Sequence, residues 1–301
     1  MEKKPILCIE CGTAKTSTNY LWDIWNQRSE KIKDTEFTLI GFSIAALRTN
    51  FFVKELNVMF DAGLSSNYAP TALFITHLHS DHFINCSWHF NPDDKKDMKI
   101  YVPKGNKTRI QNFIEASHPY NGDMSNPGMH GAYSVVEVLK DETSTIEIKG
   151  KQYILEIIGC DHTVHCVGYG LTEIKKKLKK EYLGLKGQEI KELKESGVEI
   201  NEYIHKSFFL YLGDTAKNVL LDEKITKYTT IMIECTFIAD EDEDRAELVK
   251  HMHWKHMNDF VQAHPNTTFI LYHFSGKYKR EYIKEFFDNI NLPNVIPWIS
   301  N

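Results

Sequence analysis

The chain has 301 residues, of which 42% are hydrophobic and 26% are charged, and its formal net charge is −5. This composition is typical of a globular protein with a sizeable core, and it excludes a disordered or collagen-like chain. The net charge alone does not indicate a nucleic-acid-binding protein, although local lysine clusters act independently of the total. No apolar run approaches the roughly 20 residues of a membrane-spanning helix, and the N-terminus lacks the apolar segment of a signal peptide. We therefore expect a cytosolic protein, with a nuclear or organellar address left open.

Apolar patterns predict a series of strands and helices. After a mixed segment over residues 1–34, strands are expected at Phe37–Ile40, Asn50–Val53, Val58–Phe60, Leu73–Thr76 and Lys99–Val102, a helix at Lys107–Ala116 and a loop at Ser117–Gly131. Further strands are expected at Tyr133–Leu139, Thr145–Ile148, Tyr153–Ile158, Val164–Tyr169, Ser207–Leu212, Thr229–Glu234 and Thr268–Tyr272. Helices are expected at Thr172–Lys180, Gln188–Glu195, Asp242–Ala263 (with a break near its middle) and Lys277–Asn289. Because strands come in runs with helices between and after them, we expect an α/β sandwich of two mixed sheets with helices outside.

Six cysteines occur along the chain, at positions 8, 11, 86, 160, 166 and 235. Cys8 and Cys11 form a C-x-x-C pair, but no second pair follows at the spacing of a zinc ribbon. We interpret the cysteines as reduced, mostly buried thiols rather than as a metal site.

The segment Thr76-His77-Leu78-His79-Ser80-Asp81-His82 directly follows the apolar run Ala72–Ile75. Alternate side chains of a strand point to the same side, so His77 and His79 are able to bind one ion together. Asp81 and His82 come where the chain turns, so they are free to bind a second ion close to the first. Imidazole and carboxylate are good ligands for zinc and similar divalent ions. Four such donors at a strand end have no packing role, and they predict a metal site.

Three further donors also follow apolar strands: His162, Asp214 and His273. A lone histidine or aspartate at such a place is usually structural. Four donor sites at strand ends, counting residues 77–82, indicate a shared centre, because strand ends position side chains rigidly.

Residues 171–203 are rich in lysine and glutamate and lie between two predicted strands. Their densest part holds Lys175, Lys176, Lys177, Lys179 and Lys180, and Lys186 follows. Such a run is usually a solvated helix face. We interpret the segment as an insertion that projects from the core rather than as a linker between domains.

Together these motifs resemble the metallo-β-lactamase superfamily and, within it, the short form of tRNase Z, the endoribonuclease that processes tRNA 3′ ends. The similarity covers about residues 35–290 and rests on Phe37–Ser43, Asp61 before the 77–82 motif, His162 six residues before Gly168-Tyr169, Leu212-Gly213-Asp214-Thr215, Glu234-Cys235-Thr236-Phe237 and His273-Phe274-Ser275. It implies an αββα sandwich over residues 35–301, preceded by an extension of unknown role over residues 1–34. Residues 171–203 become an inserted arm that binds tRNA.

The resemblance also implies the composition of the site. One zinc is held by His77, His79 and His162, a second by Asp81, His82 and His273, and Asp214 bridges them; Mn²⁺ or another divalent ion is an alternative. His162 is preferred to His165 by its spacing to Gly168-Tyr169.

The same resemblance implies the catalytic groups. His251 is the implied proton donor, charged and oriented by Glu234, and Asp81 is the implied acceptor of the proton of the attacking water. His253, two residues further on, is the alternative donor.

We therefore expect a zinc-dependent endoribonuclease that removes the 3′ trailer from precursor tRNA by two-metal hydrolysis. The resemblance implies a homodimer in which the arm of one subunit serves the other, with the arm lysines on tRNA phosphates. Phe83-Ile84-Asn85 stands where many members have Gly-Leu-Pro, and Lys277-Tyr278 where Arg-Tyr is common. Two alternatives stay open: a hydrolase of small phosphodiesters or other esters without a tRNA role, and a binding module without activity.

Overall fold

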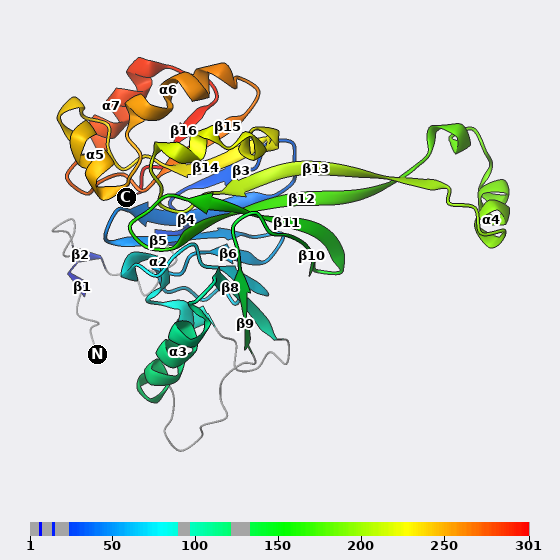
Figure 1. Ribbon diagram of the computed structural model, residues 1–301, viewed down its shortest axis with the longest axis horizontal. Coiled ribbons are helices and arrows are strands. Elements are labelled where there is room, and N and C mark those ends of the chain that lie inside the picture. The colour runs from blue at the N-terminus through cyan, green and yellow to red at the C-terminus, as the bar shows by residue number, and fades with distance from the viewer. Residues whose placement is uncertain (1–5, 8–13, 16–23, 90–96, 122–132, 301) are drawn as a thin grey trace.

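Two seven-stranded sheets form the body of the protein in the computed structural model, which describes residues 6–7, 14–15, 24–89, 97–121 and 133–300 (Figure 1). The first sheet contains, in spatial order, Ser29–Lys31 (β3), Thr38–Ile44 (β4), Arg48–Val53 (β5), Val58–Phe60 (β6), Ala72–Phe74 (β7), Met98–Pro103 (β8) and Tyr133–Val138 (β9). From β3 to β6 neighbouring strands are antiparallel, and from β6 to β9 they are parallel.

The second sheet repeats this plan. It contains Thr143–Ile148 (β10), Lys151–Cys160 (β11), Cys166–Leu178 (β12), Asn201–Tyr211 (β13), Thr230–Glu234 (β14), Thr268–Tyr272 (β15) and Val295–Pro297 (β16). Neighbours are antiparallel from β10 to β13 and parallel from β13 to β16. Two short strands, Ile6–Leu7 (β1) and Ala14–Lys15 (β2), pair with each other near the N-terminus.

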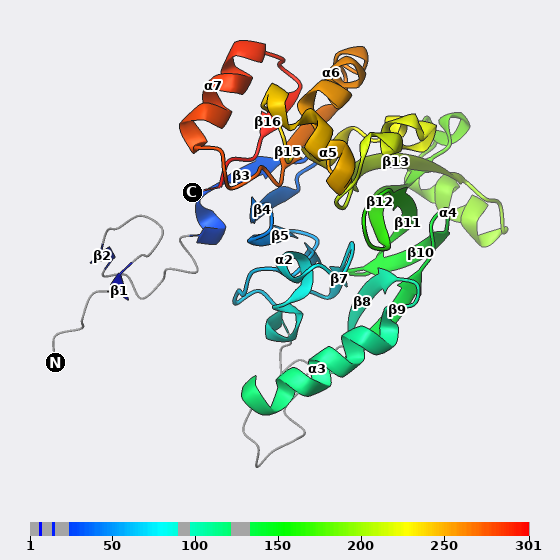
Figure 2. The same ribbon diagram turned by 60° about the vertical axis from the view of Figure 1, so that its left-hand side comes forward.

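Helices cover the outer faces of both sheets (Figures 1 and 2). The described helices are Ser80–Phe83 (α2), Lys107–Asn121 (α3), Gly187–Glu195 (α4), Glu243–Val249 (α5), Trp254–Ala263 (α6) and Arg280–Ile290 (α7). Short 3₁₀ helices occupy Cys86–His89, Lys180–Tyr182, Lys217–Leu221, Glu223–Lys227 and Asp240–Asp242. The predicted αββα sandwich is confirmed.

Three apolar layers explain this arrangement. The strand β15 shows how: Ile270 and Tyr272 pack in the layer between the sheets, while Phe269 and Leu271 face α6 and α7. Side chains of a strand alternate between its faces, so a strand buried on both sides must be apolar throughout. Ile110 of α3 packs in a third layer on the outer face of the first sheet. Each sheet is therefore fixed from both sides.

The ends of the parallel strands lie at one edge of the sandwich. The strand β7 leads to His77, β13 to Asp214, β14 ends at Glu234 and β15 leads to His273. The carboxyl ends of parallel strands meet at the same edge of a sheet, where open α/β sheets also bind ligands. Residues far apart in sequence are thereby brought together on a rigid base.

The arm is a two-stranded ribbon. The predicted helix Thr172–Lys180 is wrong, because β12 runs through Leu178 and pairs with β13, from Glu173 opposite Lys206 to Leu178 opposite Asn201. Lysine and glutamate favour a helix only weakly, and pairing with a second strand overrides that preference. The ribbon projects far from the sandwich, and α4 lies near its tip (Figure 1). The predicted helix Gln188–Glu195 is confirmed within α4.

Other sequence predictions differ from the structure at their boundaries. The expected helix Asp242–Ala263 is divided into α5 and α6, as its predicted break required. The helix α3 continues to Asn121, past its predicted end, and the rest of the expected loop lies outside the described residues. The C-x-x-C pair also lies outside them.

Part of the segment over residues 1–34 joins the sandwich. The strand β3 pairs with β4, and Trp25 and Ile32 are buried in the apolar layers. Among the helices in the described ranges, none has the length and apolar character to cross a bilayer.

Candidate metal centre

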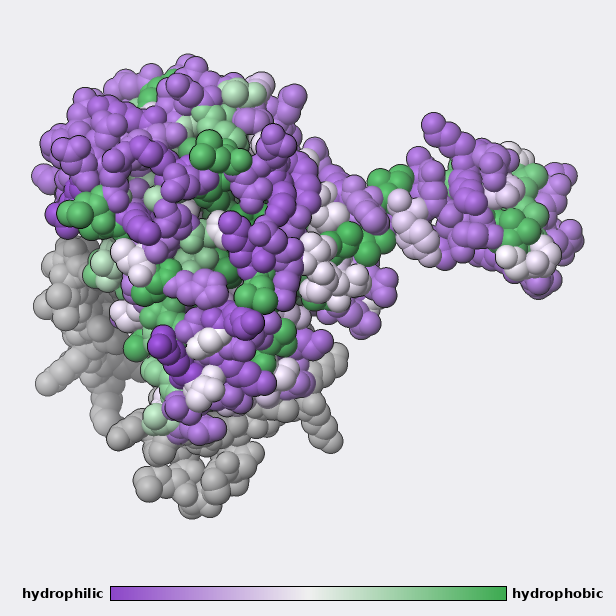
Figure 3. Space-filling model, viewed as in Figure 1, coloured by the Kyte–Doolittle hydropathy of each residue, from purple (hydrophilic) through white to green (hydrophobic). Residues whose placement is uncertain are grey.

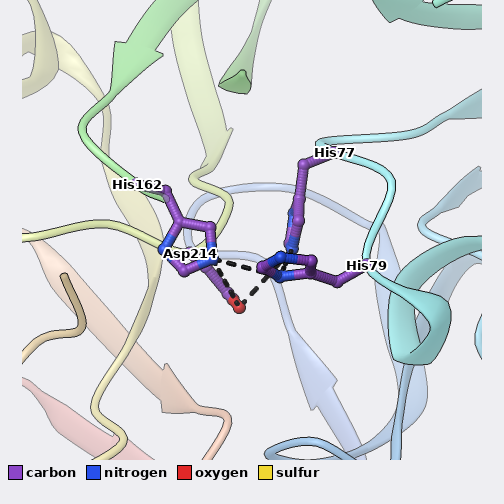
Figure 4. Close-up of side chains that lie close together, drawn as sticks. All are labelled: His77, His79, His162 and Asp214. Atoms are coloured by element: carbon purple, nitrogen blue, oxygen red, sulfur yellow. Dashed lines mark hydrogen bonds and ion pairs between the residues drawn. The ribbon is translucent and has the colours of Figure 1, made fainter. Parts of the chain in front are cut away.

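Side chains from three strand ends converge on one point (Figure 4). His79 Nδ1 lies 3.1 Å from His77 Nε2 and 3.2 Å from His162 Nε2. Asp214 Oδ2 lies 3.6 Å from the His77 nitrogen and 3.9 Å from that of His162. The structure thus brings together all four residues predicted around the first ion.

The residues predicted around a second ion form an adjacent group. His82 Nε2 lies 3.3 Å from His273 Nε2, and Asp81 Oδ2 lies 3.3 Å from the latter nitrogen. Asp214 Oδ2 lies 3.4 Å from His82 Nε2 and 3.5 Å from His273 Nε2. One oxygen of Asp214 therefore lies between the two groups, which is the arrangement that a bridging ligand requires.

The spacing and chemistry of these donors suit divalent cations. Ligand atoms about 2.0–2.1 Å from a tetrahedral zinc lie about 3.3 Å from one another, close to the separations in both groups. The second oxygen of Asp214, Oδ1, is buried and has no hydrogen-bond partner in the described part of the chain. A buried carboxylate oxygen without a partner is costly unless a cation compensates it. The two groups therefore fit zinc or a similar ion, with their histidines and carboxylates as ligands.

Asp61 orients two of the histidines. His82 donates its Nδ1–H to Asp61 at 2.8 Å, and the Thr76 hydroxyl, which donates to Asp61 at 2.9 Å, accepts from His77 Nδ1 at 3.0 Å. Tyr211 donates a further hydrogen bond of 2.7 Å to Asp61. A carboxylate behind a metal-binding histidine fixes the tautomer and the direction of its free nitrogen. Both histidines therefore turn Nε2 toward Asp214.

Glu234 performs a similar role on the other side of the centre. His251 donates Nδ1–H to Glu234 Oε1 at 2.7 Å, and Thr236 donates its hydroxyl to Oε2 at 2.6 Å. His273 Nδ1 lies 3.0 Å from the same hydroxyl, which leaves its Nε2 for the second group. Burial opposes protonation of His251, but Glu234 raises its pKa to about 9. This imidazole is therefore charged at neutral pH and retains a free Nε2–H.

Sequence and structure comparisons agree on one relationship. No family model matches the chain. Two Arabidopsis thaliana proteins, chloroplastic tRNase Z TRZ2 and tRNase Z TRZ1, are 26% and 27% identical to it over 258 residues, which cover 83% of this chain and 70% and 89% of theirs. The nuclear ribonuclease Z of Triticum aestivum is 27% identical over 54% of this chain and 91% of its own.

Two solved structures show the same fold. Human tRNase Z, short form (ELAC1), matches with a TM-score of 0.53 and 16% identity over 90% of this chain and 93% of its own. The metallo-β-lactamase fold protein YhfI from Bacillus subtilis matches with a TM-score of 0.55 and 10% identity over 87% and 96%. The chain is similar in sequence to tRNase Z proteins and has the metallo-β-lactamase fold.

Electrostatics around the first group of donors favour metal binding. Burial lowers the pKa of His77 well below its usual value, and it also lowers the pKa values of His79 and His162. Although burial acts in the opposite direction, His273 and His82 hold the pKa of Asp214 well below its usual range. Neutral imidazoles beside an ionised carboxylate are the forms that bind metals.

The alternative residues considered from the sequence lie elsewhere. His253 is buried, donates Nε2–H to the Ala239 carbonyl at 2.9 Å and accepts from the Lys255 backbone N–H at 3.1 Å. Its Nδ1 caps the start of α6 and its Nε2–H is used by Ala239, so it is not free to act as a proton donor. His165 is exposed and lies 3.1 Å from the Lys104 carbonyl, away from the centre.

His251 itself has a competing geometric role, since it forms a third possible metal group with Asp214 and His273. Its Nδ1 is 4.0 Å from Asp214 Oδ2 but only 2.7 Å from Glu234 Oε1. The shorter contact favours a hydrogen-bonded imidazolium over a ligand. Both groups border an open cavity of about 500 Å³, whose walls include Phe237, Arg245 and His251.

The arm lysines are not brought to the centre. Lys175, Lys176 and Lys177 lie on the exposed part of β12, and Lys176 lies over the ring of Tyr203 on β13 at 5.7 Å. The remaining predicted arm lysines, Lys179, Lys180 and Lys186, lie between the ribbon and α4. Figure 3 shows a largely hydrophilic surface along the projecting arm.

Several functional contacts were not predicted from the sequence. Thr76 and Tyr211 reach Asp61, Thr236 links His273 to Glu234, and the Lys250 carbonyl accepts from His162 Nδ1 at 3.0 Å. A threonine directly before His77 and another two residues after Glu234 are the only local signals of these roles.

Proposed function

We propose that the chain is a metal-dependent endoribonuclease that removes the 3′ trailer from precursor tRNA. The observation that carries the proposal is the combination of a seven-donor centre with the His251–Glu234 pair beside it. The similarity to proteins named tRNase Z over most of the chain supports RNA as the substrate.

Two divalent ions, zinc first, are proposed at the centre, one held by His77, His79 and His162 and the other by Asp81, His82 and His273. Asp214 is the shared ligand. When bound, such ions lower the pKa of water toward about 7 and neutralise charge on a phosphodiester.

The residues of the chain then supply positioning and proton transfer. Asp81 Oδ2, at the edge of the centre, is the proposed acceptor of the proton of the attacking water. His251 Nε2 is the proposed donor to the ribose 3′-oxygen that leaves, which is a poor leaving group without a proton. Glu234 makes this possible because it holds Nδ1–H and keeps the imidazole charged.

The projecting arm is the proposed contact for the body of the tRNA. Exposed lysines along a ribbon supply sequence-independent, salt-sensitive attraction to phosphates. A homodimer in which each arm serves the other subunit's centre, and a cytosolic location, belong to the same proposal. The plant relatives are named chloroplastic in one case and nuclear in another, so they do not point to one compartment.

The test is cleavage of a 3′-extended precursor tRNA by the wild type, His79→Ala and His251→Ala, with metal content measured for each. We expect His79→Ala to lose metal and activity. His251→Ala should keep its metal and cleave at least about 100-fold more slowly, the size of a general-acid contribution. Loss of metal from His251→Ala would instead make it a ligand. A wild type that hydrolyses only small phosphodiesters would favour the alternative hydrolase.

A further inference from the structure

A second cavity adjoins the metal centre. It has a volume of about 480 Å³ and is formed by the loop after β4, the segment that leads into α7 and the C-terminal residues. Ser275 and Lys277 line both this cavity and the one at the metal centre. The two cavities therefore adjoin each other at these two residues.

Charge along this path favours a polyanion. Lys277, Lys279 and Arg280 line the second cavity, and Glu281 is the one acidic residue among the lining residues. Lys277 is paired with Asp242. Lys279 and Arg280 are exposed, and neither forms an ion pair within the described ranges. Two cations without protein partners thus lie beside a phosphodiester-cleaving centre.

The cavity also offers apolar surface. Leu47, which is 60% exposed, and Ile44 form part of its wall. An apolar wall beside unpaired cations suits a nucleotide, because its base packs on apolar surface and its phosphate binds cations.

The chemistry of cleavage indicates which part of the precursor tRNA enters the second cavity. His251 protonates the 3′-oxygen that stays with the tRNA body, so the body lies on the side of His251. The walls on that side, Phe237 and Arg245, belong to the first cavity only. The phosphorus stays with the trailer, which must leave the centre on a different side, and the second cavity adjoins the centre at Ser275.

On this basis, which rests on the proposed function, we propose that the second cavity binds the first nucleotides of the 3′ trailer. Lys279 and Arg280 contact trailer phosphates, while Leu47 supports a base. They are specificity residues rather than catalytic ones, because neither borders the metal centre.

The experiment compares kcat/KM for precursor tRNAs whose trailers are one, two, four and eight nucleotides long. The variant is Lys279→Ala/Arg280→Ala, and the matched control is Lys284→Ala, which removes a cation of α7 that pairs with Asp288 and does not line the cavity. For the wild type and the control, kcat/KM should rise with trailer length. The double variant should lose about ten-fold on the longer trailers, the effect of two phosphate contacts, and little on the one-nucleotide trailer.

Hydrolysis of bis(p-nitrophenyl) phosphate, which has no trailer, should be the same in all three proteins. An equal loss on every trailer length would place the cations on the tRNA body and overturn the inference. No loss on any length would do the same. A wild type without activity on any precursor tRNA, but active on the small diester, would instead contradict the proposed function itself.

Discussion

The metal centre and the arm are built on opposite principles. The centre stands on the ends of strands that are buried on both faces, and Asp61, Glu234 and the Lys250 carbonyl fix its histidines. The arm is a ribbon whose two strands pair only with each other beyond the sandwich, and its lysines are mostly exposed. The geometry of the centre depends on tertiary packing, whereas the arm is a two-stranded ribbon that carries exposed charged side chains. We therefore expect substitutions in the centre to act on metal and chemistry, and changes in the arm to act on RNA affinity alone.

The largest effect should come from Asp214→Ala. Its Oδ2 lies between both donor groups, so its loss separates them and removes the shared ligand. We expect metal content well below that of the wild type and a loss of activity of more than about 1,000-fold on precursor tRNA and on a small diester. Binding of precursor tRNA, measured by filter retention, should change less than two-fold. A large loss of RNA affinity would show that the centre and the arm are not separable.

Removal of the arm should give the opposite result. Leu171 and Thr172 are buried, so the deletion must leave them, and Glu173 lies opposite Lys206 in the ribbon. Replacing residues 174–205 by Asn-Gly closes the hairpin with a favoured two-residue turn. We expect kcat/KM for precursor tRNA to fall by about 100-fold or more, because several phosphate contacts are lost.

Hydrolysis of a small diester and metal content are the controls for this deletion, and both should stay within two-fold of the wild type. If precursor tRNA is still cleaved at the wild-type rate, the arm has no part in RNA binding. If diester hydrolysis fails as well, the ribbon supports the sandwich rather than the substrate.

The same contrast explains what the sequence predicted. The donors of the centre were found because each follows an apolar strand, and strand ends at one edge of a sheet must meet. The arm was predicted from its lysines, but its strand was interpreted as a helix, since residues 172–180 lack the alternation of apolar and polar side chains that marks a strand. Only the pairing with residues 201–206 decides their conformation.

Contacts behind the centre were beyond the sequence for a different reason. Tyr211 reaches Asp61 from a strand 150 residues away, and nothing near either residue records that approach. The strands β3 and β16 were missed because each has three residues and lies at a sheet edge, where one neighbour suffices. Short-range patterns thus predict candidate ligands, while the groups that orient them are seen only in the fold.

Asp161→Ala should have a moderate effect on metal affinity. It tests how far the positions of the metal-binding side chains depend on the loops that carry them. Asp161 bonds Lys250 at 2.7 Å and Asn218 at 3.1 Å, and its backbone N–H donates to Thr215 at 3.1 Å. It therefore joins the loop of His162 to the loops of Asp214 and His251. We expect about ten-fold weaker metal affinity, the usual effect of an outer support, measured by titration with Co²⁺ and its visible spectrum.

Stability should hardly change in that variant, because the pair is partly exposed and worth at most about 1 kcal/mol. The control is Lys224→Ala, which removes a comparable exposed pair with Asp141 and touches no ligand loop. Equal metal affinity in both variants would mean that the loops hold His162 without Asp161.

The smallest effect on activity should come from replacing His89, because this residue contributes to the stability of the first sheet and not to the metal centre. His89 is buried against the Leu64 carbonyl and the Ser66 hydroxyl, and burial lowers its pKa to about 4. The unfolded chain, with a histidine pKa near 6.5, then binds the proton more tightly. Stability is fully present above about pH 6.5 and is lost as the pH falls toward 4. Between pH 7 and 4.5 the loss should be about 2 kcal/mol.

The matched protein is His89→Gln, whose free energy of unfolding in urea should fall less over that range. The ligand histidines titrate in both proteins, so the difference between the two slopes isolates His89. Identical slopes would mean that His89 is protonated, or exposed to solvent, in the folded protein. In that case the stability of the first sheet would not depend on a buried neutral histidine. The contrast with the arm would then apply to the metal-binding side chains and the groups that orient them, and not to the sheet beneath them.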